Sequence, residues 1–152
     1  MPNEIKLKNI APANFTITLA GLATGLAQAS ASLDNSVTDY PIAIVDLEIT
    51  SGAIDPTAGA LYEIYLLRHN GTIGDDGWVG TDAPITIENA PMLGTIVVTA
   101  TAAKAFYGKF DTSNFILGST WGIAVKNASG QALSATEADH IKSYRYHVPE
   151  IQ

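Results

Sequence analysis

The sequence predicts an all-β protein, an antiparallel β-sandwich of about eight strands. Apolar and polar residues alternate with period two through much of the chain, and the alternating segments are rich in β-branched residues. Clusters of Gly, Pro, Asn and Asp separate them at short intervals, as in sandwiches and barrels. The length of 152 residues fits one core. We assign residues 13–152 to a single sandwich domain, preceded by an N-terminal arm, residues 1–12.

The clearest strands lie in the middle of the chain. Residues 42–50 follow Pro41 and combine β-branched residues with alternating acids. Residues 61–69 place Tyr62, Ile64 and Leu66 on one face. The other predicted strands are 15–19, 92–101, 105–110, 121–127 and 140–148.

The Ala- and Ser-rich stretch 21–33 fits two structures. Its residue types favour a helix, whereas the spacing of Ala27, Ala29, Ala31 and Leu33 favours a strand of small residues. We interpret it as a strand. A helix here would change the strand count by one or two.

Within the strand 121–127, the large apolar residues recur at every second position. Trp121, Ile123 and Val125 therefore share one face. A tryptophan in such a strand more often packs between sheets than on a surface. We predict that these three residues belong to the structural core.

Composition and charge narrow the classes of partner. The chain has 15 Asp and Glu against 8 Lys and Arg, a net charge of -7, which opposes binding to nucleic acid. It lacks Cys, an apolar stretch of membrane-spanning length and a secretory signal pattern, so we expect no disulfides and no membrane partner. Only 15% of residues are charged, which suits a protein whose faces are covered by neighbours.

Motifs for catalysis are missing from the sequence. It contains no Gly-x-Ser-x-Gly motif and no phosphate-binding loop. His140 and His147 lie at opposite ends of one predicted strand, too far apart to share a metal ion. We therefore expect no enzymatic activity, no cofactor and no metal centre.

A turn-rich loop, residues 70–77, leads into Trp78. We expect this loop to be exposed, with Trp78 available to stack on a sugar ring or to anchor a protein interface. Its acids, Asp75 and Asp76, would line the same contact loop, although a solvated loop is the simpler interpretation of them.

The N-terminal arm carries a short alternating pattern. Ile5, Leu7 and Ile10 are apolar, and Lys6 and Lys8 lie between them. These apolar residues could add a strand to a neighbouring subunit and so contact a shell or another copy. Equally, residues 1–10 could complete the sheet of their own chain.

The pattern of several segments together resembles a known family. The segments are the Ala/Ser-rich strand running into Leu33-Asp34-Asn35-Ser36, the hydrophobic strand after it, the run from Trp121 to Leu133 and the late His140. Over about residues 15–147 the chain resembles small virion proteins of tailed bacteriophages, of the capsid decoration, or cement, type.

This resemblance implies a jelly-roll body without enzymatic activity, often assembled as a homotrimer. Such a protein is made in the host cytoplasm, binds the outside of an assembled capsid and stabilises it by bridging major capsid subunits. The alternative is a carbohydrate- or receptor-binding β-sandwich of a phage tail or fibre, in which Trp78 and the loop acids would form the sugar site.

Overall fold

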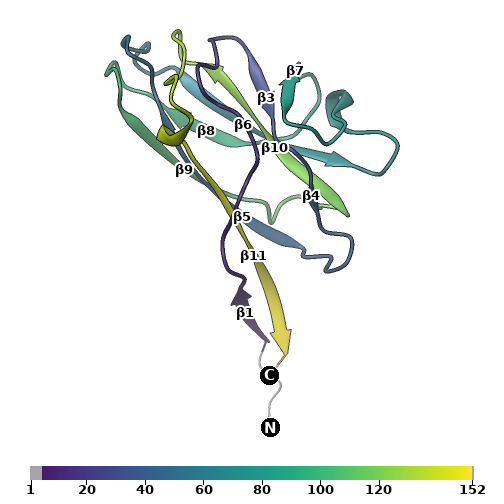
Figure 1. Cartoon of the computed structure of the whole chain (residues 1–152). Coiled ribbons are helices and arrows are strands. Elements are labelled where there is room, and N and C mark those ends of the chain that lie inside the picture. The colour runs from purple at the N-terminus through teal and green to yellow at the C-terminus, as the bar shows by residue number, and fades with distance from the viewer. Residues whose placement is uncertain (1–4, 152) are drawn as a thin grey trace.

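Two antiparallel sheets face each other across one apolar core in the computed structural model of the chain (Figure 1). The structure describes residues 5–151, with the side chains of Lys8 and of residues 10–148. In this part of the chain there are eleven strands and two short 3-10 turns, and no helix long and apolar enough to cross a bilayer.

The strands are β1 (Ile5–Asn9), β2 (Ala13–Asn14), β3 (Ala27–Ala29), β4 (Leu33–Asp34), β5 (Ile42–Thr50), β6 (Leu61–His69), β7 (Ala83–Ile85), β8 (Met92–Val97), β9 (Ala105–Asp111), β10 (Thr120–Ala128) and β11 (Ile141–Ile151). The 3-10 turns are η1 (Asp75–Gly77) and η2 (Glu137–Asp139). The first sheet has the order β1-β11-β5-β9, with β2 also paired to β11. The second has the order β7-β3-β10-β6-β8, with β4 also paired to β10.

The strand order is that of a jelly roll. β1 and β2 both pair with β11, and β3 and β4 both pair with β10, so each pair acts as one interrupted strand. If each interrupted strand is counted once and β7 is left out, eight strands remain. Numbered in chain order, they form one sheet in the order 1-8-3-6 and the other in the order 2-7-4-5. All but one of the connections cross between the sheets. The predicted antiparallel sandwich is confirmed, including its jelly-roll form.

The strands with the clearest alternation are predicted best. The segments 42–50 and 61–69 match β5 and β6 residue for residue, and 105–110 and 121–127 lie within β9 and β10. In β5, every second residue is buried, from Ala43 to Ile49. This alternation is what a strand with one face on the core requires.

The segment 15–19 is not a strand, although its predicted alternation is present. The chain crosses here from one sheet to the other: the Phe15 N–H donates to the Lys142 carbonyl of β11, and the Thr16 carbonyl accepts from Ala31, beyond β3. A crossing segment has no continuous neighbour strand, so no ladder forms. The buried side chains of this segment are Phe15, Ile17 and Leu19.

At the end of this crossing segment, a carboxylate accepts the backbone hydrogen bonds that a neighbouring strand would otherwise accept. Glu137 accepts hydrogen bonds from the amides of Leu19 (2.8 Å) and Ala20 (2.7 Å) and pairs with Lys142, which also donates to the Ile17 carbonyl. Burial alone would raise the pKa of Glu137, but the Lys142 ammonium and the two amides outweigh burial and hold it below its usual value.

The stretch 21–33 is part strand and part turn, and it contains no helix. β3 and the start of β4 lie within it, and both pair with β10. Ala27 and Ala29 are buried, so the small-residue strand interpretation holds for β3, while residues before it form turns.

Aromatic side chains join the two sheets. Trp121 on β10 is fully buried, and its Nε1–H donates to the Tyr146 hydroxyl on β11 (2.9 Å). Phe15 and Tyr144 each meet the Trp121 ring edge to face, and Tyr40 stacks against Tyr146. Burial raises the pKa of Tyr146 to about 12, so its hydroxyl stays protonated at neutral pH. The predicted core residues are all fully buried: Trp121, Ile123 and Val125.

Replacing Tyr146 by Phe would leave the Trp121 Nε1–H buried without an acceptor. An unsatisfied buried donor costs about 1–3 kcal/mol. We expect Tyr146→Phe to lower the free energy of unfolding by that amount in urea denaturation. Tyr107→Phe is the control, since Tyr107 is 71% exposed and its variant should stay within about 0.5 kcal/mol of the parent. Equal losses in both variants would contradict the role given to the Trp121–Tyr146 bond.

Candidate functional site

The loop between β6 and β8 folds back onto the outer face of the second sheet. Trp78 lies at its centre and is only 3% exposed, so the expectation that it forms an exposed contact is wrong. Its Nε1–H donates to the Ser30 carbonyl (2.9 Å), and its ring packs in a second apolar cluster with Tyr65 and Leu67 of β6 and Ala124 of β10. The indole cannot stack on an external ligand.

The acids of this loop are bound by the chain itself. Asp75 accepts from the Arg68 amide (3.1 Å) and pairs with its guanidinium (3.0 Å). Asp76 takes three backbone N–H donors, from residues 88, 89 and 90. Burial would raise the pKa of Asp76, but these three amides outweigh it and lower the pKa instead. Both carboxylates therefore hold the loop in place.

Asp76 adopts a left-handed backbone conformation, with φ of 51°, followed by Gly77 at 75°. These two residues reverse the direction of the chain, so that Trp78 turns inward. The hydrogen bonds that the Asp76 carboxylate accepts from three backbone amides offset the strain that a non-glycine residue has in this conformation. The sequence does contain a signal that the outer face of β6 is covered by another segment. Tyr65-Leu66-Leu67 is apolar on both faces of its strand, which indicates a strand buried on both sides.

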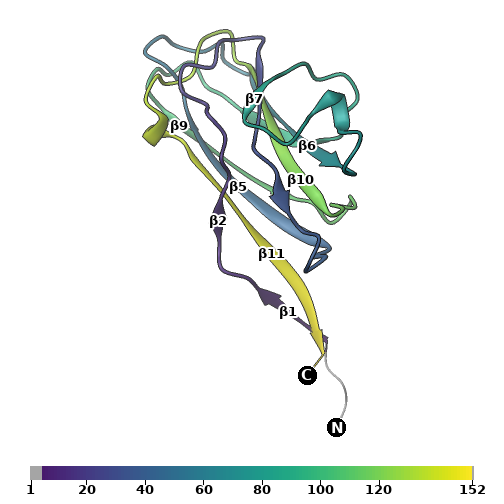
Figure 2. The same ribbon diagram turned by 45° about the vertical axis from the view of Figure 1, so that its right-hand side comes forward.

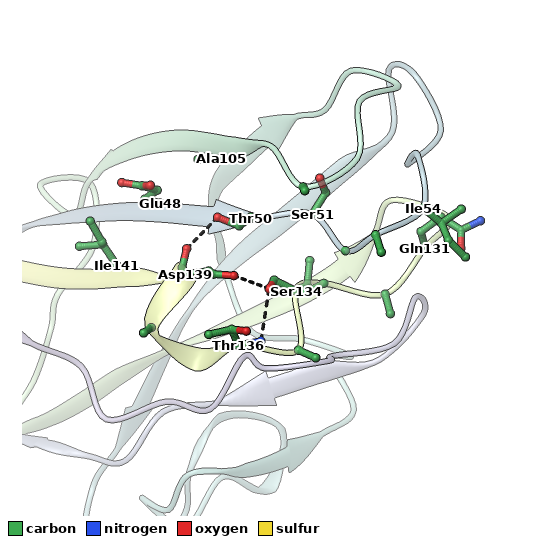
Figure 3. Close-up of a pocket in the computed structure, with 17 residues that line it drawn as sticks. Glu48, Thr50, Ser51, Ile54, Ala105, Gln131, Ser134, Thr136, Asp139 and Ile141 are labelled. Atoms are coloured by element: carbon green, nitrogen blue, oxygen red, sulfur yellow. Dashed lines mark hydrogen bonds between the residues drawn. The ribbon is translucent and has the colours of Figure 1, made fainter.

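A shallow concavity (Figure 3) is lined in part by Thr50, which lies at the opposite end of β5 from Ile42, the residue that pairs with His147. It has a volume of about 800 Å³, and its lining contains six alanines together with polar residues such as Glu48, Ser51 and Gln131. Some of its polar groups bond to one another: the Thr50 hydroxyl donates to the Asp139 carbonyl, and the Ser134 hydroxyl donates to the Asp139 carboxylate (Figure 3). These groups are therefore already paired within the chain.

Ser134, Asp139 and His140 are neighbours here, but they do not form a nucleophilic arrangement. The His140 Nε2 faces the Ser134 backbone carbonyl (3.3 Å) and its Nδ1 accepts from the Thr50 amide, so the imidazole takes no proton from the Ser134 hydroxyl. Burial lowers the pKa of His140, which keeps the ring neutral at physiological pH. Within the described residues no cluster of three or more His, Cys, Asp or Glu gathers that could hold a metal ion.

The most distinctive feature is a two-stranded ribbon that projects beyond the sandwich (Figures 1 and 2). β11 pairs with β5 only as far as His147, opposite Ile42. Beyond that residue it continues to Ile151, and there it pairs only with β1. The ribbon consists of β1 and residues 148–151.

The ribbon decides between the two interpretations of the N-terminal arm. Residues 5–9 complete the sheet of their own chain, in the register Ile5 opposite Ile151 and Asn9 opposite His147. Ile10 is partly buried against the core, and its N–H donates to the Tyr146 carbonyl (3.0 Å). The side chains of Ile5 and Leu7, predicted to contact a shell or neighbour, lie outside the described residues, as do residues 1–4.

Loops at the same end of the sandwich carry exposed apolar residues. Asp34 and His69 both pair with Thr120, so the loops that leave these three positions emerge together. The exposed apolar residues on these loops are Val37, Ile73 and Ile116. With the ribbon they form one attachment end, which we define as β1, residues 148–151 and the loops 35–41, 70–74 and 112–119.

The inward position of Trp78 predicts a structural role for it. We expect Trp78→Ala to lower the free energy of unfolding by about 3–5 kcal/mol, as for other large-to-small core changes. Tyr107→Ala is the matched aromatic control and should change it by only about 0.5 kcal/mol, because that ring is exposed. Thermal and urea unfolding of both variants test this, and a stable Trp78→Ala protein would contradict the packing described.

Comparisons with protein-family models, with curated proteins and with solved structures found no match for this chain.

Proposed function

We propose that the chain is a non-enzymatic structural protein of a bacteriophage virion, which binds the outside of the assembled capsid and bridges major capsid subunits. The observation that carries this proposal is the projecting ribbon of β1 and residues 148–151, whose two strands pair with each other and with no third strand of the described chain. A lone two-stranded ribbon is at best marginally stable in water. A neighbouring subunit would supply the missing contacts.

The chemistry of the attachment end supports docking on protein. Val37 is 89% exposed and Ile116 is 81% exposed, on loops that lie side by side, since the Asn35 amide donates to the Ser119 carbonyl. Exposed apolar residues gathered near an open strand edge are typical of interaction surfaces. The jelly-roll connectivity also agrees with the family that the sequence resembles.

The resemblance further implies a homotrimer at the surface of the virion. A trimer would present three attachment ends at once to a repeating shell. Weak individual contacts then combine, because the second and third binding events are intramolecular. A trimer would therefore bind an assembled capsid much more tightly than it binds a free coat subunit.

Co-sedimentation of the purified full chain with empty phage shells tests the proposal. We expect binding to shells and little binding to free coat subunits. Ile116→Glu, which adds a charge to the attachment end, should weaken shell binding by at least about tenfold. Ile54→Glu is the control, since Ile54 is 65% exposed on the loop that follows β5 at the opposite end. A chain that ignores shells, or equal weakening by both variants, would overturn the proposal.

A carbohydrate-binding role in a tail or fibre is the second candidate, with Tyr107 in place of Trp78 as the ring that would stack on a sugar. Trp78 is buried, but Tyr107 is exposed on the outer face of the first sheet, in a shallow groove beside Asp46 and Glu48. Asp46 pairs with Lys109 and Arg145, so the feature that favours sugar stacking is the exposed Tyr107 ring beside Glu48.

A glycan array with the parent chain and with Tyr107→Ala tests this second candidate. Sugar binding that is lost in Tyr107→Ala would support it, since the exposed ring is the stacking surface. Trp78→Phe, which keeps a buried aromatic ring, should leave any such binding unchanged. An array without signal for the parent chain removes the candidate.

A further inference from the structure

The loop that follows β6 begins with an exposed asparagine and glycine. Asn70 and Gly71 open a tight turn, in which the Asn70 N–H donates to the Ile73 carbonyl (3.2 Å) and His69 pairs with Gly74. A Cβ built on Gly71 would meet no atom within 4 Å. No side chain therefore crowds the Gly71 backbone nitrogen, and the residue is open to solvent.

The Gly71 N–H is bound by an imidazole. It donates to Nδ1 of His69 (2.9 Å), so in the neutral ring the proton lies on Nε2. Gly74 leaves room for this ring, because a Cβ there would lie 2.9 Å from the His69 Cδ2. Imidazole is the side chain best suited to remove a proton at neutral pH. The chain thus holds a base against the proton that must leave before the Gly71 nitrogen can act as a nucleophile.

The side-chain carbonyl of Asn70 is polarised by two backbone amides. Its Oδ1 accepts hydrogen bonds from the Thr72 N–H (3.0 Å) and the Ile73 N–H (2.8 Å). Two donors on one carbonyl oxygen stabilise the negative charge that develops there when a nucleophile adds to the carbon. A nucleophile, a base and two oxyanion donors therefore all lie within residues 69–73.

Two other asparagines have a carboxylate in place of the imidazole. The N–H of the residue after Asn35 donates to Asp34 (2.8 Å), and the N–H of the residue after Asn89 donates to Asp76 (2.9 Å). Hydrogen bonds from Ser36 lower the pKa of Asp34. Burial alone would raise the pKa of Asp76, but backbone amides outweigh burial and lower it. Both carboxylates are therefore weak bases, and neither removes an amide proton as readily as an imidazole does.

We propose that Asn70 is a site of self-modification, which the chain converts to aspartate or isoaspartate with His69 as the general base. His69 takes the proton of the Gly71 N–H as that nitrogen forms a bond to Asn70 Cγ. The bond between Cγ and Nδ2 then breaks, and the imidazole returns its proton to the leaving nitrogen, which departs as ammonia. Water opens the resulting cyclic imide at one carbonyl or the other, which gives aspartate or isoaspartate.

The modification changes one loop of the attachment end. It replaces a neutral amide by a carboxylate in the same turn as Ile73, which is an exposed apolar residue. Where isoaspartate forms, the main chain gains an extra carbon atom within the turn that the pairing of His69 with Gly74 closes. The inference does not rest on the proposed function, because the chain alone carries out the reaction.

Peptide mapping by mass spectrometry tests the proposal on the purified full chain, aged at neutral pH and physiological temperature. We expect aspartate and isoaspartate to accumulate at Asn70 and to stay near background at Asn35 and Asn89. An Asn70 that stays unmodified, or that reacts no faster than Asn89, would overturn the proposal.

Two variants test the base. His69→Gln keeps an acceptor for the Gly71 N–H but removes the imidazole, and it should slow the reaction at Asn70 by at least about tenfold. Thr72→Ser is the matched control in the same loop, because it keeps the backbone N–H that binds Asn70, and it should react at the parent rate. Circular dichroism and urea unfolding verify that both variants are folded. Equal rates in the parent and in His69→Gln would contradict the role given to His69.

Ageing the same proteins in guanidinium chloride separates the folded arrangement from the sequence alone. Unfolding breaks the hydrogen bond between Gly71 and His69, so the parent and His69→Gln should then react at equal rates. A difference between them that persists in the unfolded chain would come from neighbouring residues in the sequence, and it would overturn the proposal that the folded turn positions the base.

Discussion

The buried contact between Trp121 and Tyr146 links the core of the sandwich to the base of the ribbon. It joins the two sheets through a hydrogen bond and edge-to-face rings, in a core where an unpaired indole N–H would be costly. Tyr146 is also the last buried residue of β11 before the ribbon, and its carbonyl receives the N–H of Ile10. The same residue thus closes the sandwich and fixes the base from which β1 and residues 148–151 project.

Several acidic side chains of this chain hold its own backbone in place. Glu137 binds the amides at the end of the crossing segment, Asp76 binds three amides of the loop that covers Trp78, and Asp82 accepts from the Thr18 amide and hydroxyl. Each of these carboxylates accepts hydrogen bonds from backbone amides that have no strand partner. Carboxylates used in this way are charged and paired in the folded protein, so they are not available to bind metal or to exchange protons with a substrate.

The two ends of the sandwich differ in what they offer a partner. At the end remote from the ribbon, the concavity beside Thr50 contains hydroxyl groups that are already bonded to Asp139. At the other end, an open strand edge lies with the exposed loop residues Val37 and Ile116. Ile54 is exposed at the remote end as well, but the projecting strand pair lies at the ribbon end, and this difference favours attachment there.

The fold class and the core could be predicted from the sequence, because period-two alternation in β5 and the spacing of Trp121, Ile123 and Val125 are local consequences of a strand with one buried face. The sequence also predicted the correct residues of β6, yet the prediction missed that this strand is buried on both sides. The burial of Trp78, the crossing of residues 15–19 between the sheets and the pairing of β1 with its own chain could not be predicted from local sequence. Each of these depends on contacts between segments far apart in sequence, and local alternation carries no information about which segment supplies the partner.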